Sequence, residues 1–75
     1  MLARTSLPLS ARERDVLGYV ALGYTNAQIG LACGTSPNTI KMQLRSIFKK
    51  LGTSTRAETV HVAMLEGILE TRLAS

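Results

Sequence analysis

The chain has 75 residues, with nine lysines and arginines against five aspartates and glutamates, and carries a net charge of +4. A chain of this length forms one domain that buries only about 60% of the surface exposed on unfolding, so a second copy or a larger parent protein could add buried area. The basic balance favours polyanionic partners. No apolar run approaches the roughly 20 residues of a membrane span, and no signal-peptide pattern opens the chain.

The single cysteine, Cys33, excludes an internal disulfide and a cysteine-based metal cluster. This cysteine usage fits a reducing compartment, and we expect a cytoplasmic protein that has no contact with the membrane. We expect no metal and no cofactor.

Four hydroxyl residues mark the expected helix starts. Three of them belong to capping boxes, in which a hydroxyl and an acid or amide three positions later satisfy the free N–H groups of the first turn. The boxes are Ser10 with Glu13, Thr25 with Gln28, and Thr55 with Glu58. The fourth start is Ser36, followed by Pro37 at the first helical position, where its missing N–H costs nothing.

Glycines mark the expected helix ends, because Gly23, Gly34 and Gly52 fall where a left-handed C-terminal residue is favoured. The pattern therefore predicts helices over residues 11–22, 26–33, 37–51 and 56–73, with no strand. Their short connections predict an all-α, four-helix bundle over residues 9–73, preceded by a leader at residues 1–8. The expected core residues of the first two helices and their approach are Leu9, Val16, Leu17, Val20, Ala21, Ile29 and Cys33.

The third helix is amphipathic. At about 100° per residue its aliphatic residues share one stripe; they are Ile40, Leu44, Ile47 and Leu51. The opposite face carries Asn38, Lys41, Met42, Arg45 and Lys49.

A basic helix face is most often simply solvated, but three features of this one favour a polyanionic partner. No acid occurs between Asp15 and Glu58, and the cations at 41, 45 and 49 are spaced to repel one another. The two middle helices have the helix-turn-helix layout, in which Ile29 would pack on Ile40 and Gly30 and Gly34 would allow a close turn. The third helix also begins with short polar groups suited to phosphate or base contacts. These groups are Ser36, Asn38 and Thr39.

The sequence resembles the LuxR-type (GerE-like) DNA-binding domain of bacterial transcription regulators over about residues 7–73. The matching elements are Leu9-Ser10, Arg12-Glu13-Arg14, Val16-Leu17, Ala21-x-Gly23-x-Thr25-Asn26-x-x-Ile29, Ser36-x-x-Thr39-Ile40-Lys41, Ile47-x-x-Lys50-Leu51-Gly52 and Arg56-Ala57-Glu58. At the position where the family most often has histidine, this chain has Gln43, which lies beside the apolar stripe.

The resemblance implies sequence-specific binding of double-stranded DNA in transcription regulation, with the helix at 37–51 in the major groove. It implies base contacts by Lys41, Met42 and Arg45. The residues expected at the DNA backbone are Thr25, Asn26, Ser36, Asn38, Thr39, Lys49 and Lys50. It also places the protein in the bacterial cytoplasm, at the nucleoid, with RNA polymerase as a further partner.

The fourth helix shows two apolar stripes about 120° apart, whereas a bundle helix needs one. Two interpretations are open: the helix is wedged between two neighbours, or one stripe forms a homodimer contact, as the family does with its last helix. The candidate interface residues are Val60, Met64 and Ile68 in one stripe and Val62, Leu65 and Leu69 in the other, which continues to Leu73.

The remaining polar residues do not suggest an enzyme. His61, the only histidine, has no acid, serine or cysteine at a catalytic or metal-binding spacing. We expect Glu13 to tie the first helix to the bundle through Arg56 or Lys50. Two alternative functions stay open at this point: a promoter-reading domain like that of sigma factors, and a protein-interaction module that keeps the fold without binding DNA.

Overall fold

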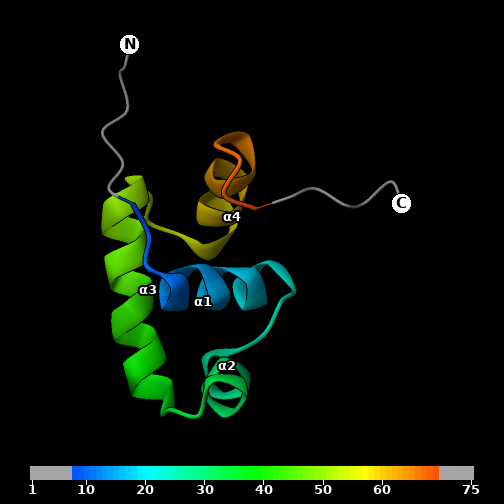
Figure 1. Cartoon of the computed structure of the whole chain (residues 1–75), viewed down its shortest axis with the longest axis vertical. Helices are drawn as coiled ribbons and strands as arrows, with labels where there is room; N and C mark the ends of the chain where they lie inside the picture. Colours follow the sequence, from blue (N-terminus) through cyan, green and yellow to red (C-terminus); the bar gives the residue numbers. More distant parts are fainter. Residues whose placement is uncertain (1–7, 70–75) are drawn as a thin grey trace.

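The computed structural model describes residues 8–69, which fold into four helices (Figure 1). These are α1 (Ala11–Ala21), α2 (Asn26–Cys33), α3 (Pro37–Leu51) and α4 (Arg56–Leu65). The predicted all-α class is confirmed, since residues 8–69 contain no strand. Helix α3 runs along one side of the molecule, and the other three pack against it, with α1 in the middle and α2 and α4 towards opposite ends (Figure 1).

The predicted caps explain where the helices begin. Complete capping boxes are present at Ser10 and at Thr25, and the Ser36 hydroxyl accepts from the Thr39 N–H at 3.1 Å. At α4 the prediction is only half right. Thr55 accepts from the Glu58 N–H, but the Glu58 carboxylate accepts from the Ser54 N–H instead of closing the box.

The end of α4 contradicts the prediction that this helix continues to Leu73. The helix stops at Leu65, and Gly67 adopts the left-handed conformation with φ of 75°. The N–H groups of Ile68 and Leu69 then both donate to the Ala63 carbonyl, at 2.8 and 3.2 Å. The chain therefore turns back on α4, and Ile68 and Leu69 pack against the core; Leu73 lies outside the described residues.

The core gathers one face of each helix. Its members are Leu9, Val16, Leu17, Val20, Ile29, Ile40, Leu44, Ile47, Leu51 and Ala63. Two residues that were expected in the core are not fully buried. Ala21 is exposed because it lies on the solvent side of the last turn of α1, and Cys33 is half-buried at the edge of the core.

Both apolar stripes of α4 lie partly against the domain itself. Its buried face is formed by Thr59 and Ala63, neither of which belongs to a stripe. Val60 and Val62, one from each stripe, flank this face and both pack partly against the core. The Thr59 hydroxyl is satisfied by the Thr55 carbonyl oxygen at 2.6 Å. Residues of both stripes therefore pack within the domain, as the wedged interpretation predicts, and the homodimer contact stays a prediction.

The turn between α2 and α3 brings backbone against backbone at Gly30. A Cβ added there would lie 2.6 Å from the Thr35 carbonyl oxygen, closer than van der Waals contact allows. Ile29 and Ile40, on either side of this turn, are completely buried in the same core. Gly30 is therefore required by the close approach of the turn to α2, as the helix-turn-helix layout predicted.

No helix within residues 8–69 is long and apolar enough to cross a lipid bilayer.

Replacing Gly30 by alanine should lower the free energy of unfolding by about 1–3 kcal/mol, because the added methyl group overpacks the turn. Gly18→Ala is the matched control, since a Cβ at this helical position meets nothing within 4 Å. The control should raise stability by up to about 1 kcal/mol through helix propensity. Urea unfolding followed by circular dichroism measures both changes, and a neutral Gly30→Ala variant would contradict the close approach.

Candidate nucleic-acid interface

The outward face of α3 carries cations that the rest of the domain leaves unpaired. Lys41, Arg45 and Lys49 are exposed, and none makes a hydrogen bond or ion pair with any residue in the range 8–69. Met42 lies among them and is 55% exposed. Asn38 is also exposed. The division of α3 into a buried aliphatic face and an exposed basic face is confirmed, because the four predicted seam residues are all buried.

The first turn of α3 offers two polar hydrogens. The Ser36 hydroxyl accepts from the Thr39 N–H and donates to Thr39 Oγ1 at 3.0 Å, so the Thr39 hydroxyl keeps its own hydrogen free. Pro37 has no N–H, and the Asn38 N–H has no partner among the described residues. These donors lie at the positive end of the helix dipole, a position that favours an anion.

The start of α2 is held by a residue from α4. Arg56 donates from Nη1 to Asn26 Oδ1 at 2.8 Å and from Nη2 to the Tyr24 carbonyl oxygen. Thr25, between these two acceptors, caps α2 with its side-chain oxygen and is exposed. No local sequence pattern predicts this contact, since Arg56 and Asn26 are thirty positions apart.

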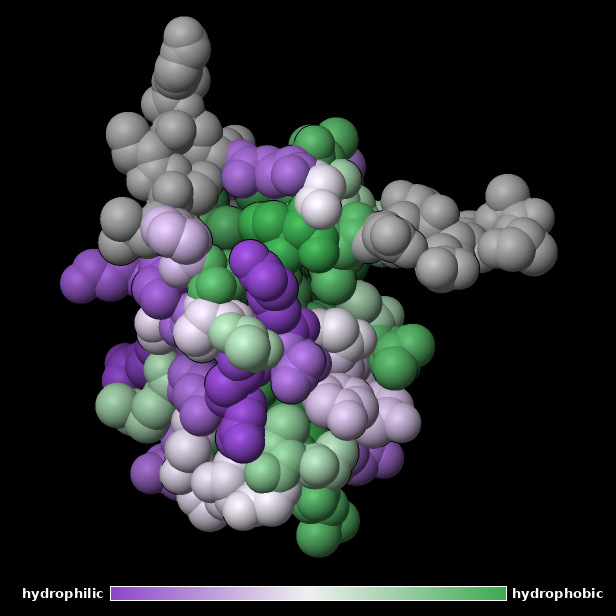
Figure 2. All heavy atoms as spheres, viewed as in Figure 1, coloured by the Kyte–Doolittle hydropathy of each residue, from purple (hydrophilic) through white to green (hydrophobic). Residues whose placement is uncertain are grey.

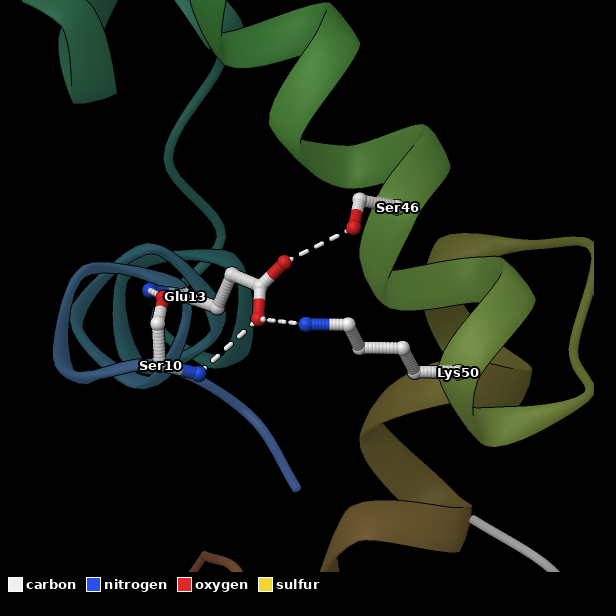
Figure 3. Close-up of polar contacts among 4 residues, drawn as sticks. All are labelled: Ser10, Glu13, Ser46 and Lys50. Carbon is white, nitrogen blue, oxygen red and sulfur yellow. Dashed lines mark hydrogen bonds and ion pairs between the residues drawn. The ribbon is translucent and has the colours of Figure 1, made fainter. Parts of the chain in front are cut away.

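The C-terminal part of α3 is tied to α1 by a buried carboxylate (Figure 3). Glu13 Oε1 accepts from the Ser10 N–H at 2.9 Å and from Lys50 Nζ at 2.8 Å. Its other oxygen, Oε2, accepts from the Ser46 hydroxyl at 2.8 Å. The predicted tie from Glu13 therefore runs to Lys50, while Arg56 turns to α2.

Burial raises the pKa of Glu13, but hydrogen bonds from Lys50, Ser10 and Ser46 outweigh it and bring the pKa down to about 2. The side chains of Lys50 and Glu13 are 24% and 10% exposed. Lys50 is thus the one cation of α3 whose charge is already balanced by a carboxylate within residues 8–69. It differs in this respect from Lys41, Arg45 and Lys49.

Gln43 does not belong to the basic face. It is half-buried, and its Oε1 is buried without a hydrogen-bond partner among the described residues. This placement agrees with the position beside the apolar stripe expected from the sequence.

The exposed face as a whole can bind an extended polyanion. It supplies three unpaired cations, an apolar side chain between them and free donors in the first turn of α3. No group of three or more His, Cys, Asp or Glu residues that could hold a metal ion occurs in the described part of the chain.

The low pKa of Glu13 makes the domain sensitive to acid. Because the carboxylate is stabilised in the folded state, its contribution is complete above its ordinary pKa of 4.5 and is lost as the pH falls towards 2. At about 1.4 kcal/mol per pKa unit, the loss approaches about 3 kcal/mol.

Glu13→Gln should therefore be less stable than the wild type at pH 7, and the gap should close between about pH 5 and pH 2. Asp15→Asn is the control, because it removes an exposed carboxyl from the same helix and leaves the Glu13 contacts in place. Urea unfolding at several pH values measures the gap. A gap between wild type and Glu13→Gln that is independent of pH would contradict the assignment.

Comparisons with known proteins agree with this arrangement. Residues 7–63 match the family described as bacterial regulatory proteins, luxR family. The chain is 49% identical over 61 residues to the HTH-type transcriptional activator RamA of Corynebacterium glutamicum, covering 81% of this chain and 22% of RamA. It is 47% identical over 58 residues to the probable transcriptional regulatory protein SgaR of Hyphomicrobium methylovorum, covering 75% of this chain and 28% of SgaR. The chain thus spans less than a third of the length of these regulators.

Solved structures show the same fold. The response regulator ChrA of a heme-sensing two-component system superposes with a TM-score of 0.81 at 30% identity, over 84% of this chain and 31% of ChrA. The transcription factor GerE superposes with a TM-score of 0.78 at 24% identity, over 83% of this chain and 92% of GerE. The relatives are named as regulators rather than as enzymes. The chain belongs to the luxR family of bacterial regulatory proteins, and its four helices form a helix-turn-helix domain of the DNA-binding, transcription-regulating type.

Proposed function

We propose that this domain, residues 9–73, binds double-stranded DNA in a sequence-specific manner, with α3 in the major groove, and that it does so as a homodimer. Its place of action is the bacterial cytoplasm, at the nucleoid, and RNA polymerase is the further partner that a regulatory role implies. The observation that carries the proposal is the set of unpaired cations on α3, which no acid of the described residues neutralises.

Base recognition is assigned to Lys41, Met42 and Arg45. All three are exposed on the face of α3 opposite its buried seam. The guanidinium of Arg45 and the ammonium of Lys41 match the O6 and N7 acceptors of guanine, and Met42 offers an apolar contact for a thymine methyl. A face that combines these groups distinguishes base pairs as well as attracting charge.

Phosphate contacts are assigned to groups around this face. The hydroxyls of Thr25 and Thr39, with their neighbour Ser36, lie at the starts of the two middle helices. The donors of Asn26 and Asn38 are available beside them. Lys49 supplies an unpaired charge further along α3, and Lys50 supplies one that is shared with Glu13.

The homodimer is assigned to the outer surface of α4. Val60, Val62, Ile68 and Leu69 already pack partly against the domain's own core, which leaves less of them for a partner. Leu65, by contrast, is 72% exposed, and hydrophobic atoms show at the surface beside α4 (Figure 2). Together with Met64, which is half-buried, Leu65 is the centre of the proposed contact. Such a dimer would present two copies of α3 to half-sites about one DNA turn apart.

A sigma-factor-like role is disfavoured by the match to the luxR family over residues 7–63. An interaction module without DNA binding would have no need of three mutually repelling cations on one exposed face. The salt dependence of duplex binding separates this last alternative from the proposal.

Arg45→Ala should lose roughly 5- to 150-fold in affinity for the preferred duplex and should discriminate less between sequences. Lys49→Ala is the matched control: it should weaken all duplexes alike and lower the slope of log K against log salt by about 0.9. Selection from a random duplex pool supplies the preferred sequence, and fluorescence anisotropy at several salt concentrations measures both variants. Equal losses on every sequence for both variants would contradict base recognition by Arg45.

Leu65→Asp should weaken self-association about tenfold or more, because it places a charge in the proposed apolar contact. Leu31→Asp is the control, since Leu31 is 85% exposed on α2 and lies outside α4. Sedimentation equilibrium over a concentration series, with and without a two-half-site duplex, measures the association. If Leu31→Asp weakens it as much as Leu65→Asp, the proposed dimer surface is wrong.

A further inference from the structure

Arg56 occupies a position that its own helix does not favour. It is the first residue of α4, where the positive end of the helix dipole opposes a cation. No carboxylate within residues 8–69 pairs with it. Instead, both ends of its guanidinium fork donate to acceptors beside the start of α2, namely Asn26 Oδ1 and the Tyr24 carbonyl oxygen. The side-chain hydrogen bonds of Arg56 therefore stabilise the start of α2 and not its own helix.

The contact fixes the orientation of the Asn26 amide. A guanidinium has donors only, so the group that faces it must be the amide oxygen and not the NH2 group. The NH2 group of Asn26 then occupies the other branch of the amide. It has no partner among the described residues, and it is not among their buried unpartnered atoms. Asn26 thus keeps two accessible donors at the start of α2, an arrangement that suits an anion.

The same fork fixes the backbone on the other side of the α2 cap. Tyr24 and Asn26 flank Thr25, so Arg56 holds the residues on both sides of the N-cap. No Cα atoms of helices α2 and α4 lie within 8 Å of each other. The Arg56 side chain is therefore the direct polar link between them.

We propose that Arg56 is a positioning residue for DNA binding: it turns the Asn26 amide so that its NH2 group donates to a DNA phosphate at the start of α2. This inference rests on the proposed DNA-binding function. Arg56 acts through Asn26 and makes no base contact itself. A lysine at this position would keep the charge but lose the planar two-pronged fork.

A double-mutant cycle at constant charge tests the proposal, with wild type, Arg56→Lys, Asn26→Ala and the double variant binding a mixed-sequence duplex. Asn26→Ala should bind about three- to tenfold more weakly, the effect of losing one hydrogen bond to a charged group. Arg56→Lys should lose a smaller but measurable factor. The double variant should bind no more weakly than Asn26→Ala, because Arg56 has nothing left to position.

A second readout follows the Asn26 side-chain amide directly by nuclear magnetic resonance. Adding duplex should shift this resonance in the wild type and shift it less in Arg56→Lys. Thermal unfolding of each variant sets a binding temperature at which all four are folded. Losses that multiply in the double variant, or an Arg56→Lys variant that binds like the wild type, would overturn the proposal.

The outcome for Arg56 can be told apart from the outcome for the proposed function. If the wild type bound no duplex, both would fall. If the wild type binds and Arg45→Ala loses base preference, but the Arg56 and Asn26 losses multiply, only the positioning role falls.

Discussion

Burial of the aliphatic seam of α3 is the constraint on which the rest of the structure depends. Ile40, Leu44, Ile47 and Leu51 lie in the core formed with α1, α2 and α4. Because side chains on one helix have fixed relative directions, burying this seam turns Lys41 and Arg45 away from the protein. The exposed basic face is therefore a consequence of packing. Burial of the seam stabilises the fold and fixes the orientation of α3 at the same time.

Two polar ties between helices complete this orientation, and each uses a charged side chain. Glu13 holds the C-terminal part of α3 through Ser46 and Lys50. Arg56 holds the start of α2 through Asn26. In each case a side chain on one helix holds a group on another, and the unpaired cations of α3 stay exposed.

The sequence predicted most of the fold because helix boundaries are encoded locally. The hydroxyl caps and the glycines at 34 and 52 lie within a few residues of the ends they set, and the structure confirms them. The end of α4 differs from the prediction, because the apolar pattern continues to Leu73 whereas the helix ends at Leu65, just before the left-handed Gly67. Those apolar residues that the structure describes instead fold back onto the core.

The long-range polar contacts were harder to predict than the helices. The tie from Glu13 was foreseen only as a choice between Lys50 and Arg56, because nothing in the spacing fixes how α1 crosses α3. No sequence pattern predicts the contact of Arg56 with Asn26, since it depends on how the start of α4 meets the start of α2. The helical period alone predicts the basic face. That Lys50 is paired with Glu13 is seen only in the structure.

The most direct test of the central claim is lysine acetylation, read by mass spectrometry, with and without saturating duplex. The outward orientation of α3 predicts that Lys41 and Lys49 react readily in the free protein and lose that reactivity when DNA is bound. Reactivity that is low without DNA, or that stays unchanged at both lysines when DNA is bound, would contradict the account.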